Sequence, residues 1–498
     1  MIDLPLLLDM AVSNDPGRTA VTGPDGRSLT GLQLSETAKA ASSLFSTLEG
    51  THIGFCGTSG VAFPVSLFGA SMAGRPFVPL NYRLGDDQLG LIIQSHDLAV
   101  VADPVQAVRL RNLGVERILE VDELLGASSA ASLESPLSPV SPDDVALVLY
   151  TSGTTSRPKA AILRHRHLTT YILNTIELGA STPEDAALLA VPPYHIAGVM
   201  NLLSNLYMGR RIVYMSDFDA ARWLDLVESD AITHAMLVPT MLSRIVATLG
   251  DSRVQNTSLR TISYGGAKMP MPVIRAALEL FPAVDFSNAY GLTETSSTVS
   301  VLGSEDHRVA FQSDDPVLRA RLGSAGQLLP GVEVEIRDDH GTVLPTAETG
   351  EIFVRGEQIA GEYLEGSRLD DKWFATRDRG YIDSDGYLFI EGRADDTIIR
   401  GGENIAPAEI EDVLREHGDV VDCAVVGIDD EEWGEKVGAA VVLAQGAKSS
   451  PEDLKAFARL HLRTSKTPDS IVIVDALPFT ETGKLLRRKV REEVFGQL

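Results

Sequence analysis

The sequence predicts an α/β fold: a large N-terminal domain of helix-covered, mostly parallel sheets with a small β-barrel-like subdomain, and a small α+β C-terminal domain. Three observations lead to this prediction. Short apolar runs alternate with helix-like stretches over residues 53–264, which is typical of parallel sheets covered by helices. From Val332 the texture changes to an alternating β pattern, at 332–336 and again at 351–354, as in barrel strands. Beyond Asp395 a different pattern begins, over about 100 residues, the size of a small domain.

The elements of the large domain follow in order. Residues 4–48 are predicted to be helical, and two strand–helix units follow at 53–80 and 89–125. Residues 126–144, rich in Ser, Ala and Pro, indicate a surface linker. The later short strands are expected at 145–149, 187–191, 211–215, 234–238 and 261–264. Residues 303–320 are polar and predicted to be irregular, and Gly- and Asp-rich turns extend to Arg393.

The C-terminal part has its own set of elements. Helices are expected at 410–417 and 451–462, and strands at 420–427, 438–443 and 471–474. The boundary is placed at Ala394–Asp395, which gives domains 1–394 and 395–498. No internal repeats are found.

Composition narrows the function classes. A net charge of −26 and a pI near 4.8 argue against nucleic-acid or anionic-membrane binding. Cys56 and Cys423 are interpreted as unpaired packing thiols of a reducing compartment. Neither a signal peptide nor a membrane span is recognised, so a cytoplasmic protein is expected, of unknown oligomeric state.

Residues 150–165 read Tyr-Thr-Ser-Gly-Thr-Thr-Ser-Arg-Pro-Lys-Ala-Ala-Ile-Leu-Arg-His, a hydroxyl-rich turn that follows a strand and contains a cation. Backbone N–H groups and hydroxyls can surround phosphate oxygens, and Lys159 can supply positive charge. The spacing differs from Gly-x4-Gly-Lys-Ser/Thr, which excludes an ordinary P-loop NTPase. A plain polar loop at a strand end is the alternative.

Further motifs follow in a fixed order. They are Tyr-Gly-Gly-Ala-Lys-Met-Pro at 264–270, Asn-Ala-Tyr-Gly-Leu-Thr-Glu-Thr at 288–295, Thr-Arg-Asp-Arg-Gly-Tyr at 376–381, Arg-Gly-Gly-Glu-Asn-Ile-Ala-Pro-Ala-Glu-Ile-Glu at 400–411 and Thr-Gly-Lys-Leu-Leu-Arg-Arg at 482–488. In this order and spacing, the chain from Leu7 to Arg491 resembles the adenylate-forming superfamily of acyl-CoA synthetases, peptide-synthetase adenylation domains and luciferases. Within it, a fatty-acyl-CoA synthetase is the most similar type.

The resemblance implies a two-step reaction that uses ATP, Mg²⁺ and coenzyme A. A carboxylate attacks the α-phosphate of Mg-ATP and yields an acyl-adenylate and pyrophosphate, after which the thiol of coenzyme A displaces AMP. Adenylyl transfer needs positioning and charge neutralisation more than an acid or a base, and the residue types of the motifs suit that need.

The resemblance also implies a role for each motif residue. The nucleotide-binding set is Thr151, Ser152, Gly153, Thr154, Thr155 and Lys159 for the phosphates, Gly266, Ala267, Asn288, Ala289 and Tyr290 for adenine, and Asp378 with Arg393 for the ribose. The catalytic set is Thr293 at the α-phosphate, Glu294 as the Mg²⁺ ligand, Lys484 at the α-phosphate and acyl oxygens, and His195 near the acyl carboxylate.

These residues also have ordinary structural interpretations. Glu294 could be a charge at a helix N-terminus, favoured by the helix dipole. Asp378 could be a turn aspartate, Lys484 a surface lysine, and His195 a packed histidine.

The family rotates its small domain between the two half-reactions, and the matching hinge residue is Asp395. Lys484 would face the site first, and the loop of Gly401 and Gly402 would then line the coenzyme A tunnel. Two glycines suit close backbone approach of a slender pantetheine arm, and a hinge needs only a few residues.

The sequence departs from the family pattern at three places. The phosphate loop has Ser156 and Ala160 where the family has glycines, and Arg377 stands in place of the glycine of Thr-Gly-Asp. Arg377 could add a cation near the nucleotide or point to solvent. A non-glycine residue loses easy access to positive φ, which puts loop mobility and ATP affinity in question.

The acid is expected to be a fatty acid, because the pocket predicted around Tyr194, Val238 and Gly265 is largely apolar. Aryl acids are the related option. Free coenzyme A is the expected acceptor; the alternatives are a ligase that loads a separate carrier protein, and a nucleotide-binding homologue without turnover.

Overall fold

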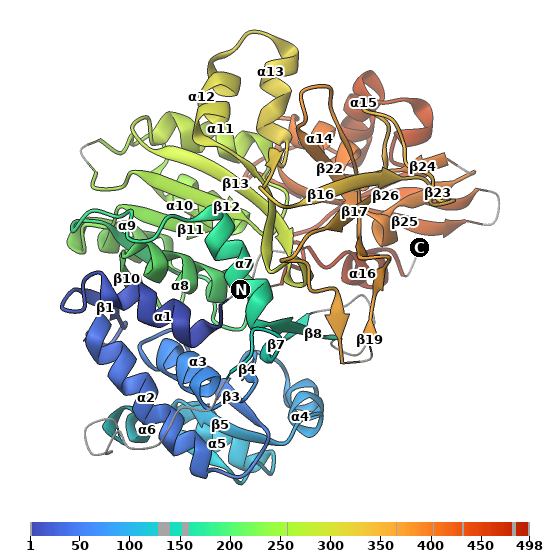
Figure 1. Ribbon diagram of the computed structural model, residues 1–498. Coiled ribbons are helices and arrows are strands. Elements are labelled where there is room, and N and C mark those ends of the chain that lie inside the picture. The colour runs from blue at the N-terminus through green and yellow to red at the C-terminus, as the bar shows by residue number, and fades with distance from the viewer. Residues whose placement is uncertain are drawn as a thin grey trace.

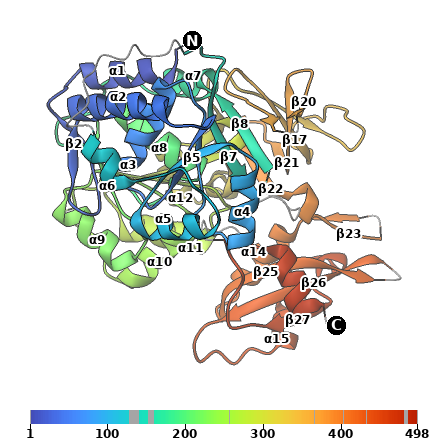
Figure 2. The same ribbon diagram turned by 90° about the horizontal axis from the view of Figure 1, so that it is seen from below.

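The computed structural model describes residues 2–127, 140–151, 159–255, 257–364, 366–401, 403–430, 433–480 and 485–496. The described residues up to 394 are called the large unit here, and those from 395 onward the small unit. Figure 1 and Figure 2 show the small unit, in orange and red, lying against one side of the large unit. None of the described helices combines the length and apolar character that crossing a bilayer requires.

The first sheet of the large unit has nine strands. In spatial order these are β15 (Gln327–Leu328), β14 (Ser297–Leu302), β13 (Asp285–Leu292), β12 (Thr261–Gly265), β11 (His234–Leu237), β9 (Ala186–Leu189), β10 (Arg211–Tyr214), β1 (Thr19–Thr22) and β2 (Ser28–Thr30). The strands from β13 to β1 run parallel, and β2, β14 and β15 are antiparallel additions at the edges.

The second sheet has eight strands. In spatial order they are β19 (Gly366–Ser367), β18 (Glu362–Tyr363), β8 (Lys159–Arg164), β7 (Val145–Thr151), β4 (Phe77–Pro79), β3 (His52–Cys56), β5 (Leu98–Ala102) and β6 (Ile118–Glu120). The strands from β7 to β6 are parallel, whereas β8, β18 and β19 are antiparallel.

Helices cover both sheets. They are α1 (Leu4–Ser13), α2 (Gly31–Thr47), α3 (Ala62–Met72), α4 (Asp86–Gln94), α5 (Pro104–Asn112), α6 (Val121–Ala127), α7 (His165–Thr175), α8 (Ile196–Met208), α9 (Ala220–Ser229), α10 (Pro239–Leu249), α11 (Met271–Leu280), α12 (Ser304–Gln312) and α13 (Pro316–Ala320). Helix α3 is buried over its whole length, because it is apolar on every side and shares one core with α2, α8 and both sheets. The predicted helix-covered, mostly parallel sheets are thus confirmed.

A third, curled antiparallel sheet completes the large unit and has a core of its own. Its strands are β16 (Glu333–Arg337), β17 (Gly350–Arg355), β20 (Leu369–Asp370), β21 (Trp373–Ile382) and β22 (Leu388–Arg393). It is half a barrel, in agreement with the barrel-like subdomain expected from the alternating pattern.

The small unit folds around a separate sheet. Its elements are β23 (Ile398–Arg400), β24 (Glu403–Ile405), α14 (Pro407–Arg415), β25 (Val420–Asp430), β26 (Gly434–Leu443), α15 (Pro451–His461), β27 (Ser470–Ile473) and α16 (Arg487–Lys489). Its two apolar clusters contain buried residues from 398 to 495 only. The α+β class is confirmed, while the boundary at 394–395 stays a prediction.

Two local predictions were wrong. Residues 4–48 are not wholly helical, because β1 and β2 form a hairpin that adds β1 to the parallel edge strand β10. Residues 303–320 are not irregular but form α12 and α13. Asp306 accepts from the N–H of Gly303 at the start of α12, and Asp315 caps α13 just before Pro316. Only His307 and Ala310 of α12 are buried, so the sequence carries little helical periodicity there.

Candidate functional site

One side of the candidate site is a stretch of bare backbone at the end of β12. Gly265 lies opposite Ala289 of β13, and a Cβ on Gly265 would be 2.4 Å from the carbonyl oxygen of Ala289. Gly266 has a φ of +86°, which favours glycine. Next to them, the Asn288 side-chain amide donates to the Ser324 carbonyl oxygen at 3.0 Å. Planar groups can approach such a backbone closely because no side chain intervenes.

Asp378, Tyr290 and Arg393 form a polar cluster beside this backbone, in which Asp378 is buried and Arg393 is partly exposed. The Tyr290 hydroxyl donates to Asp378 Oδ2 at 2.6 Å, and Arg393 Nη1 donates to Oδ1 at 2.9 Å. The cluster is fixed by the sheet, since Asp378 of β21 and Arg393 of β22 lie opposite each other. Burial raises the pKa of Tyr290 well above its usual value, and the charge of Asp378 raises it further. Tyr290 therefore stays a protonated donor.

Glu294 is a buried carboxylate that is held by a hydrogen bond from Tyr363 on β18. It lies in the 3₁₀ turn η1 (Thr293–Thr295), next to Thr293, and is 8% exposed. The Tyr363 hydroxyl donates to its Oε1, and its carbonyl oxygen accepts from the Ala360 N–H at 2.8 Å. Burial and the charge of Glu294 raise the pKa of Tyr363, so this phenol stays a donor. A turn of three residues has little dipole, which weakens the helix-N-terminus interpretation.

The two strands on either side of the phosphate motif pair with each other. Thr151 at the end of β7 lies opposite Lys159 at the start of β8. Ser152, Gly153, Thr154, Thr155 and Ser156 lie outside the described residues. Ala160 is buried within β8, where an extended backbone suits any residue, so the alanine in place of glycine is accommodated there.

Tyr363 also connects this motif to Glu294. On β18 it pairs with Ala161 of β8, two residues after Lys159. The Arg164 guanidinium reinforces the same strand pair through two hydrogen bonds to Glu362, at 2.8 and 3.0 Å. The base of the phosphate motif and Glu294 are thus fixed to one another.

His195 lies at the N-terminus of α8, in contact with aromatic rings. Its ring is 4.6 Å from that of Tyr194, which in turn meets Tyr82 edge-to-face at 5.4 Å. Burial lowers the pKa of His195 to about 4, and the charge of Arg83 contributes. The imidazole is therefore neutral near pH 7 and can donate or accept a hydrogen bond.

Arg377 points away from the polar cluster. Its Nε is 4.0 Å from Glu351 Oε1, and its side chain is 58% exposed, whereas the next residue, Asp378, is buried. Of the two interpretations given for Arg377, the one that points it to solvent fits. The residue has a φ of +63° at an irregularity in the pairing of β17 with β21, which explains why the related motif has glycine at this place.

Of the remaining predicted residues, the described Asp395 and Gly401 lie away from this site. Asp395 lies exposed in the turn η3 (Ala394–Asp396) between the units. Gly401 lies in the β23–β24 hairpin, which points away from the large unit in both views (Figures 1 and 2). Gly402 and Lys484 lie outside the described residues. Ala267 follows Gly266 in the loop that leads to α11.

A polar cavity of about 280 Å³ lies between the two units. The large unit contributes Thr349, Arg379, Glu391, Gly392 and Arg393, and the small unit Thr397, Ala406, Pro407, Glu409 and Lys466. Arg393 therefore borders this cavity while it holds Asp378.

Two contributors were missed by the sequence reasoning. Tyr363 orients Glu294, and Lys268 reaches the small unit, where it pairs with Asp412 at 2.7 Å. The tyrosine stands in no recognised motif, and only the pairing of β18 with β8 reveals it. Lys268 belongs to the quoted Gly-Gly-Ala-Lys motif, but its partner comes from a distant segment that no spacing indicates.

The protein offers one carboxylate, Glu294, to a magnesium ion whose other ligands would be phosphate and water oxygens. The described residues hold no group of three or more His, Cys, Asp or Glu side chains that could enclose a metal. Glu294 is a single carboxylate beside a predicted phosphate site, and Mg²⁺ prefers one or two carboxylates plus phosphate and water. The arrangement fits such an ion.

The chain matches known proteins in both sequence and fold. A family model described as "AMP-binding enzyme" matches residues 8–364, and one described as "AMP-binding enzyme C-terminal domain" matches residues 409–484.

Among individual proteins, the chain is similar to a feruloyl-CoA synthase of an Amycolatopsis species, with 35% identity over 97% of this chain and 96% of that one. It is 34% identical to a fatty acid–[acyl-carrier-protein] ligase of Streptomyces coeruleorubidus, over 95% and 93% of the two chains. Its fold matches an o-succinylbenzoate-CoA synthetase of Bacillus subtilis in complex with an acyl-adenylate intermediate, with a TM-score of 0.85, 26% identity and 99% of each chain covered.

Proposed function

The chain belongs to the AMP-binding enzyme family and is an AMP-forming acid–CoA ligase, and from this premise we propose that it activates a carboxylic acid bearing an aromatic ring. ATP and the acid react to an acyl-adenylate and pyrophosphate, and coenzyme A then takes the acyl group and releases AMP. The observation that carries adenylate formation is the Tyr290–Asp378–Arg393 cluster beside bare backbone, within a chain that matches the family over both of its parts.

We assign the nucleotide contacts as follows. Asp378, whose oxygens lie next to Tyr290 and Arg393, accepts the ribose hydroxyls. Gly266, Ala267 and the strand around Asn288 receive the adenine ring. Lys159, Thr151 and the rest of the hydroxyl-rich motif hold the outer phosphates, because charge-assisted hydrogen bonds favour anionic oxygens.

We assign the residues around the α-phosphate in the same way. Thr293 donates to the α-phosphate, and Glu294, oriented by Tyr363, would hold Mg²⁺, which neutralises charge on the phosphate oxygens. Lys484 supplies a cation to the α-phosphate and the acyl oxygens, and it stabilises charge that develops there.

An aromatic acid is supported by two observations. The ring of Tyr194 contacts those of His195 and Tyr82 just before α8, where the family resemblance puts the acid, and aromatic side chains favour ring-to-ring contacts. A full-length relative is a feruloyl-CoA synthase. A fatty acid, the expectation from the sequence, is the second candidate, since another relative is a fatty acid–[acyl-carrier-protein] ligase.

We further propose that the chain forms two domains, 1–394 and 395–498, with Asp395 as the hinge. The separate apolar cores support this division. In the second half-reaction the hairpin of Gly401 and Gly402 would turn toward the large unit and line the path of coenzyme A.

The test is pyrophosphate release from Mg-ATP with a panel of straight-chain, branched and aromatic carboxylates, with and without coenzyme A, and with products identified by mass spectrometry. An aryl-CoA formed in preference to other thioesters is the expected result. Preferred turnover of long-chain acids would replace the aromatic substrate by the fatty acid. An acyl-adenylate without thioester would favour a carrier-protein acceptor, and ATP binding without turnover would favour the inactive homologue.

A further inference from the structure

An ion pair joins the adenine-side loop of the large unit to the small unit. Lys268 Nζ lies 2.7 Å from Asp412 Oδ2, and the two side chains are 41% and 46% exposed. Within the part of the chain that the structure describes, no second ion pair crosses between the units. Lys268 follows Gly266 by two residues, so the contact begins at the backbone proposed to receive adenine.

Asp412 is held in place by a guanidinium on its own helix. Arg415 lies one turn further along α14, and its Nη1 is 3.7 Å from Asp412 Oδ1. Arg415 also binds Asp422 at 3.0 Å and the Cys423 carbonyl oxygen at 3.1 Å, so its side chain is fixed. A partner that is already ordered costs less conformational entropy when the ion pair forms. The Lys268–Asp412 pair is therefore stronger than an ion pair between two mobile surface side chains.

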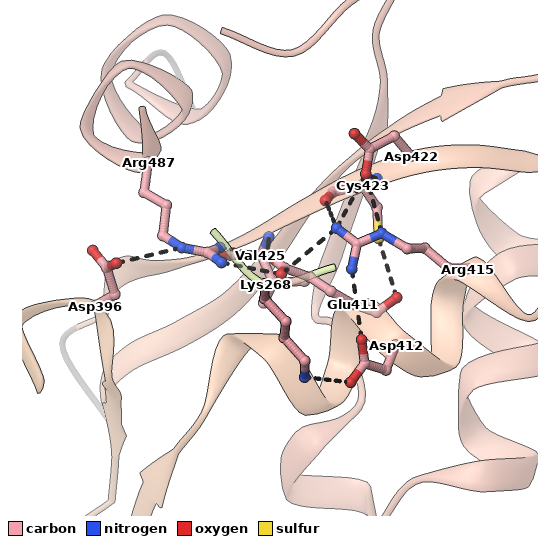
Figure 3. Close-up of polar contacts among 9 residues, drawn as sticks. All are labelled: Lys268, Asp396, Glu411, Asp412, Arg415, Asp422, Cys423, Val425 and Arg487. Carbon is pink, nitrogen blue, oxygen red and sulfur yellow. Dashed lines mark hydrogen bonds and ion pairs between the residues drawn. The ribbon is translucent and has the colours of Figure 1, made fainter. Parts of the chain in front are cut away.

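The same helix holds the segment that follows Lys484. The Arg487 guanidinium donates two hydrogen bonds to the buried Glu411, and its Nε lies 3.5 Å from Asp396, next to the predicted hinge residue (Figure 3). Figure 3 shows these contacts and the Lys268–Asp412 pair meeting on α14. A contact that holds α14 against the large unit therefore also positions two segments bound to this helix: the hinge turn and the segment after Lys484.

The β23–β24 hairpin shows which orientation of the small unit the Lys268–Asp412 pair maintains. The N–H of Gly401 donates to the Trp433 carbonyl oxygen at 2.7 Å, and a Cβ on Gly401 would lie 3.0 Å from the Trp433 ring. The hairpin is thus packed within the small unit and points away from the large unit (Figure 2). Of the two orientations in the proposed function, this is the one used for adenylate formation.

We propose that Lys268 and Asp412 are positioning residues for adenylate formation: their ion pair holds the small unit in the orientation of the first half-reaction. This inference rests on the proposed function. The pair must break when the small unit turns, so it favours the first orientation over the second. Its strength is that of a partly exposed pair, so losing it changes the balance between the orientations by a modest factor.

The experiment compares Lys268→Asp, Asp412→Lys and the exchanged pair Lys268→Asp/Asp412→Lys. Acid-dependent ATP–pyrophosphate exchange measures adenylate formation, and thioester formation from prepared acyl-adenylate and coenzyme A measures the second step. Each single variant is expected to lose about two- to ten-fold in exchange, because like charges then face each other, and to keep or gain thioester formation. The exchanged pair restores opposite charges across the units but sets a second cation beside Arg415, so it is expected to recover only part of the lost exchange and to exceed both single variants.

The matched control is Arg244→Asp, which reverses an exposed charge on α10 of the large unit and should leave both half-reactions unchanged. High salt should reduce the difference between Lys268→Asp and the wild type, because exposed charges are screened. An equal loss of both half-reactions in the single variants, or an exchanged pair no more active in exchange than the single variants, would overturn the inference.

A second readout does not depend on catalysis. Fluorophores on Val317→Cys in α13 and Leu460→Cys in α15 report the distance between the units, since these side chains are 64% and 80% exposed while both native cysteines are buried. Lys268→Asp should change energy transfer between the dyes, and the exchanged pair should restore it in part. If the wild type shows neither half-reaction, the proposed function is wrong. If energy transfer is unchanged in every variant, only the ion-pair inference is wrong.

Discussion

At the scale of single residues, Tyr363 determines how Glu294 presents its carboxylate. Removal of the hydroxyl in Tyr363→Phe leaves Glu294 without its phenol donor. Because groups that orient a metal ligand affect metal affinity about 10- to 100-fold, we expect the half-saturating Mg²⁺ concentration to rise about ten-fold. Direct Mn²⁺ binding, followed by electron paramagnetic resonance, should weaken in parallel.

Tyr171→Phe provides the comparison for Tyr363→Phe. The Tyr171 hydroxyl is partly buried and donates to Thr298 at 3.4 Å, and we expect its loss to leave the metal dependence as it is. An unchanged Mg²⁺ requirement in Tyr363→Phe would show that the phenol does not act through Glu294.

Arg377 is a second residue with a measurable consequence. Its φ of +63° is unfavourable for a residue with a Cβ, so Arg377→Gly should raise the free energy of unfolding of the large unit by about 1 kcal/mol. Arg377→Ala keeps the Cβ and should give no such gain. Urea unfolding of the three proteins measures the difference, and an equal gain in both variants would assign the effect to lost charge.

The candidate site could be predicted from the sequence as far as its motifs reach. The motifs place Asp378 near Arg393 and Tyr290 because each lies in a contiguous, recognisable run, and the structure brings the three together. The role of Tyr363 was not predicted, because its contact with Glu294 depends on the pairing of β18 with β8, which are distant in sequence. The direction in which Arg377 points was left open, since it depends on a local irregularity of the sheet.

At the scale of elements, α14 organises the small unit around the buried pair of Glu411 and Arg487. Burial is the largest single influence and by itself would raise the pKa of Glu411. The charge and hydrogen bonds of Arg487, the charge of Arg415 and the Val425 N–H together outweigh it, so the pKa is lowered. Replacing one member leaves the other charge buried, and Glu411→Gln should cost about 3–5 kcal/mol of the small unit's unfolding free energy at pH 7. The exposed Glu416→Gln at the end of the same helix should cost less than about 0.5 kcal/mol.

The sign of the pH dependence follows from the lowered pKa. A carboxylate with a depressed folded-state pKa stabilises above its unfolded value, about 4.3, and this contribution is lost as pH falls through the lower folded value. The deficit of Glu411→Gln should therefore be constant from pH 6 to 8 and shrink in acid. Denaturant unfolding at several pH values tests this, and a deficit that persists below the folded-state pKa would refute it.

Elements with strong periodicity were predicted well, and those without it were not. The apolar runs at 145–149 and 234–238 correspond to β7 and β11, because buried parallel strands leave a continuous apolar signature. Helices α12 and α13 were missed because they are short and mostly exposed, and their caps rather than their faces define them. The β1–β2 hairpin was missed because its partner, β10, lies far along the chain.

At the scale of the whole molecule, the turn at Asp395 should separate the two half-reactions. Proline fixes φ near −65°, which a 3₁₀ turn accepts, but it prevents the rotation that a hinge needs. Asp395→Pro should retain adenylate formation and lose at least ten-fold in thioester formation, measured as separate half-reactions. Asp395→Ala removes the carboxylate without restricting φ and should retain both. Equal loss of the two half-reactions in Asp395→Pro would move the hinge elsewhere.

The packing of Gly401 on Trp433 gives the molecule an optical reporter of its own. Trp223 and Trp373 are buried, whereas Trp433 is 45% exposed beside the outward-pointing hairpin. A collisional quencher such as iodide should therefore reach the emission of this indole in preference to the other two. If the hairpin turns inward with coenzyme A as proposed, that emission should become shielded, and the loss of quenching would follow the rotation in unlabelled protein.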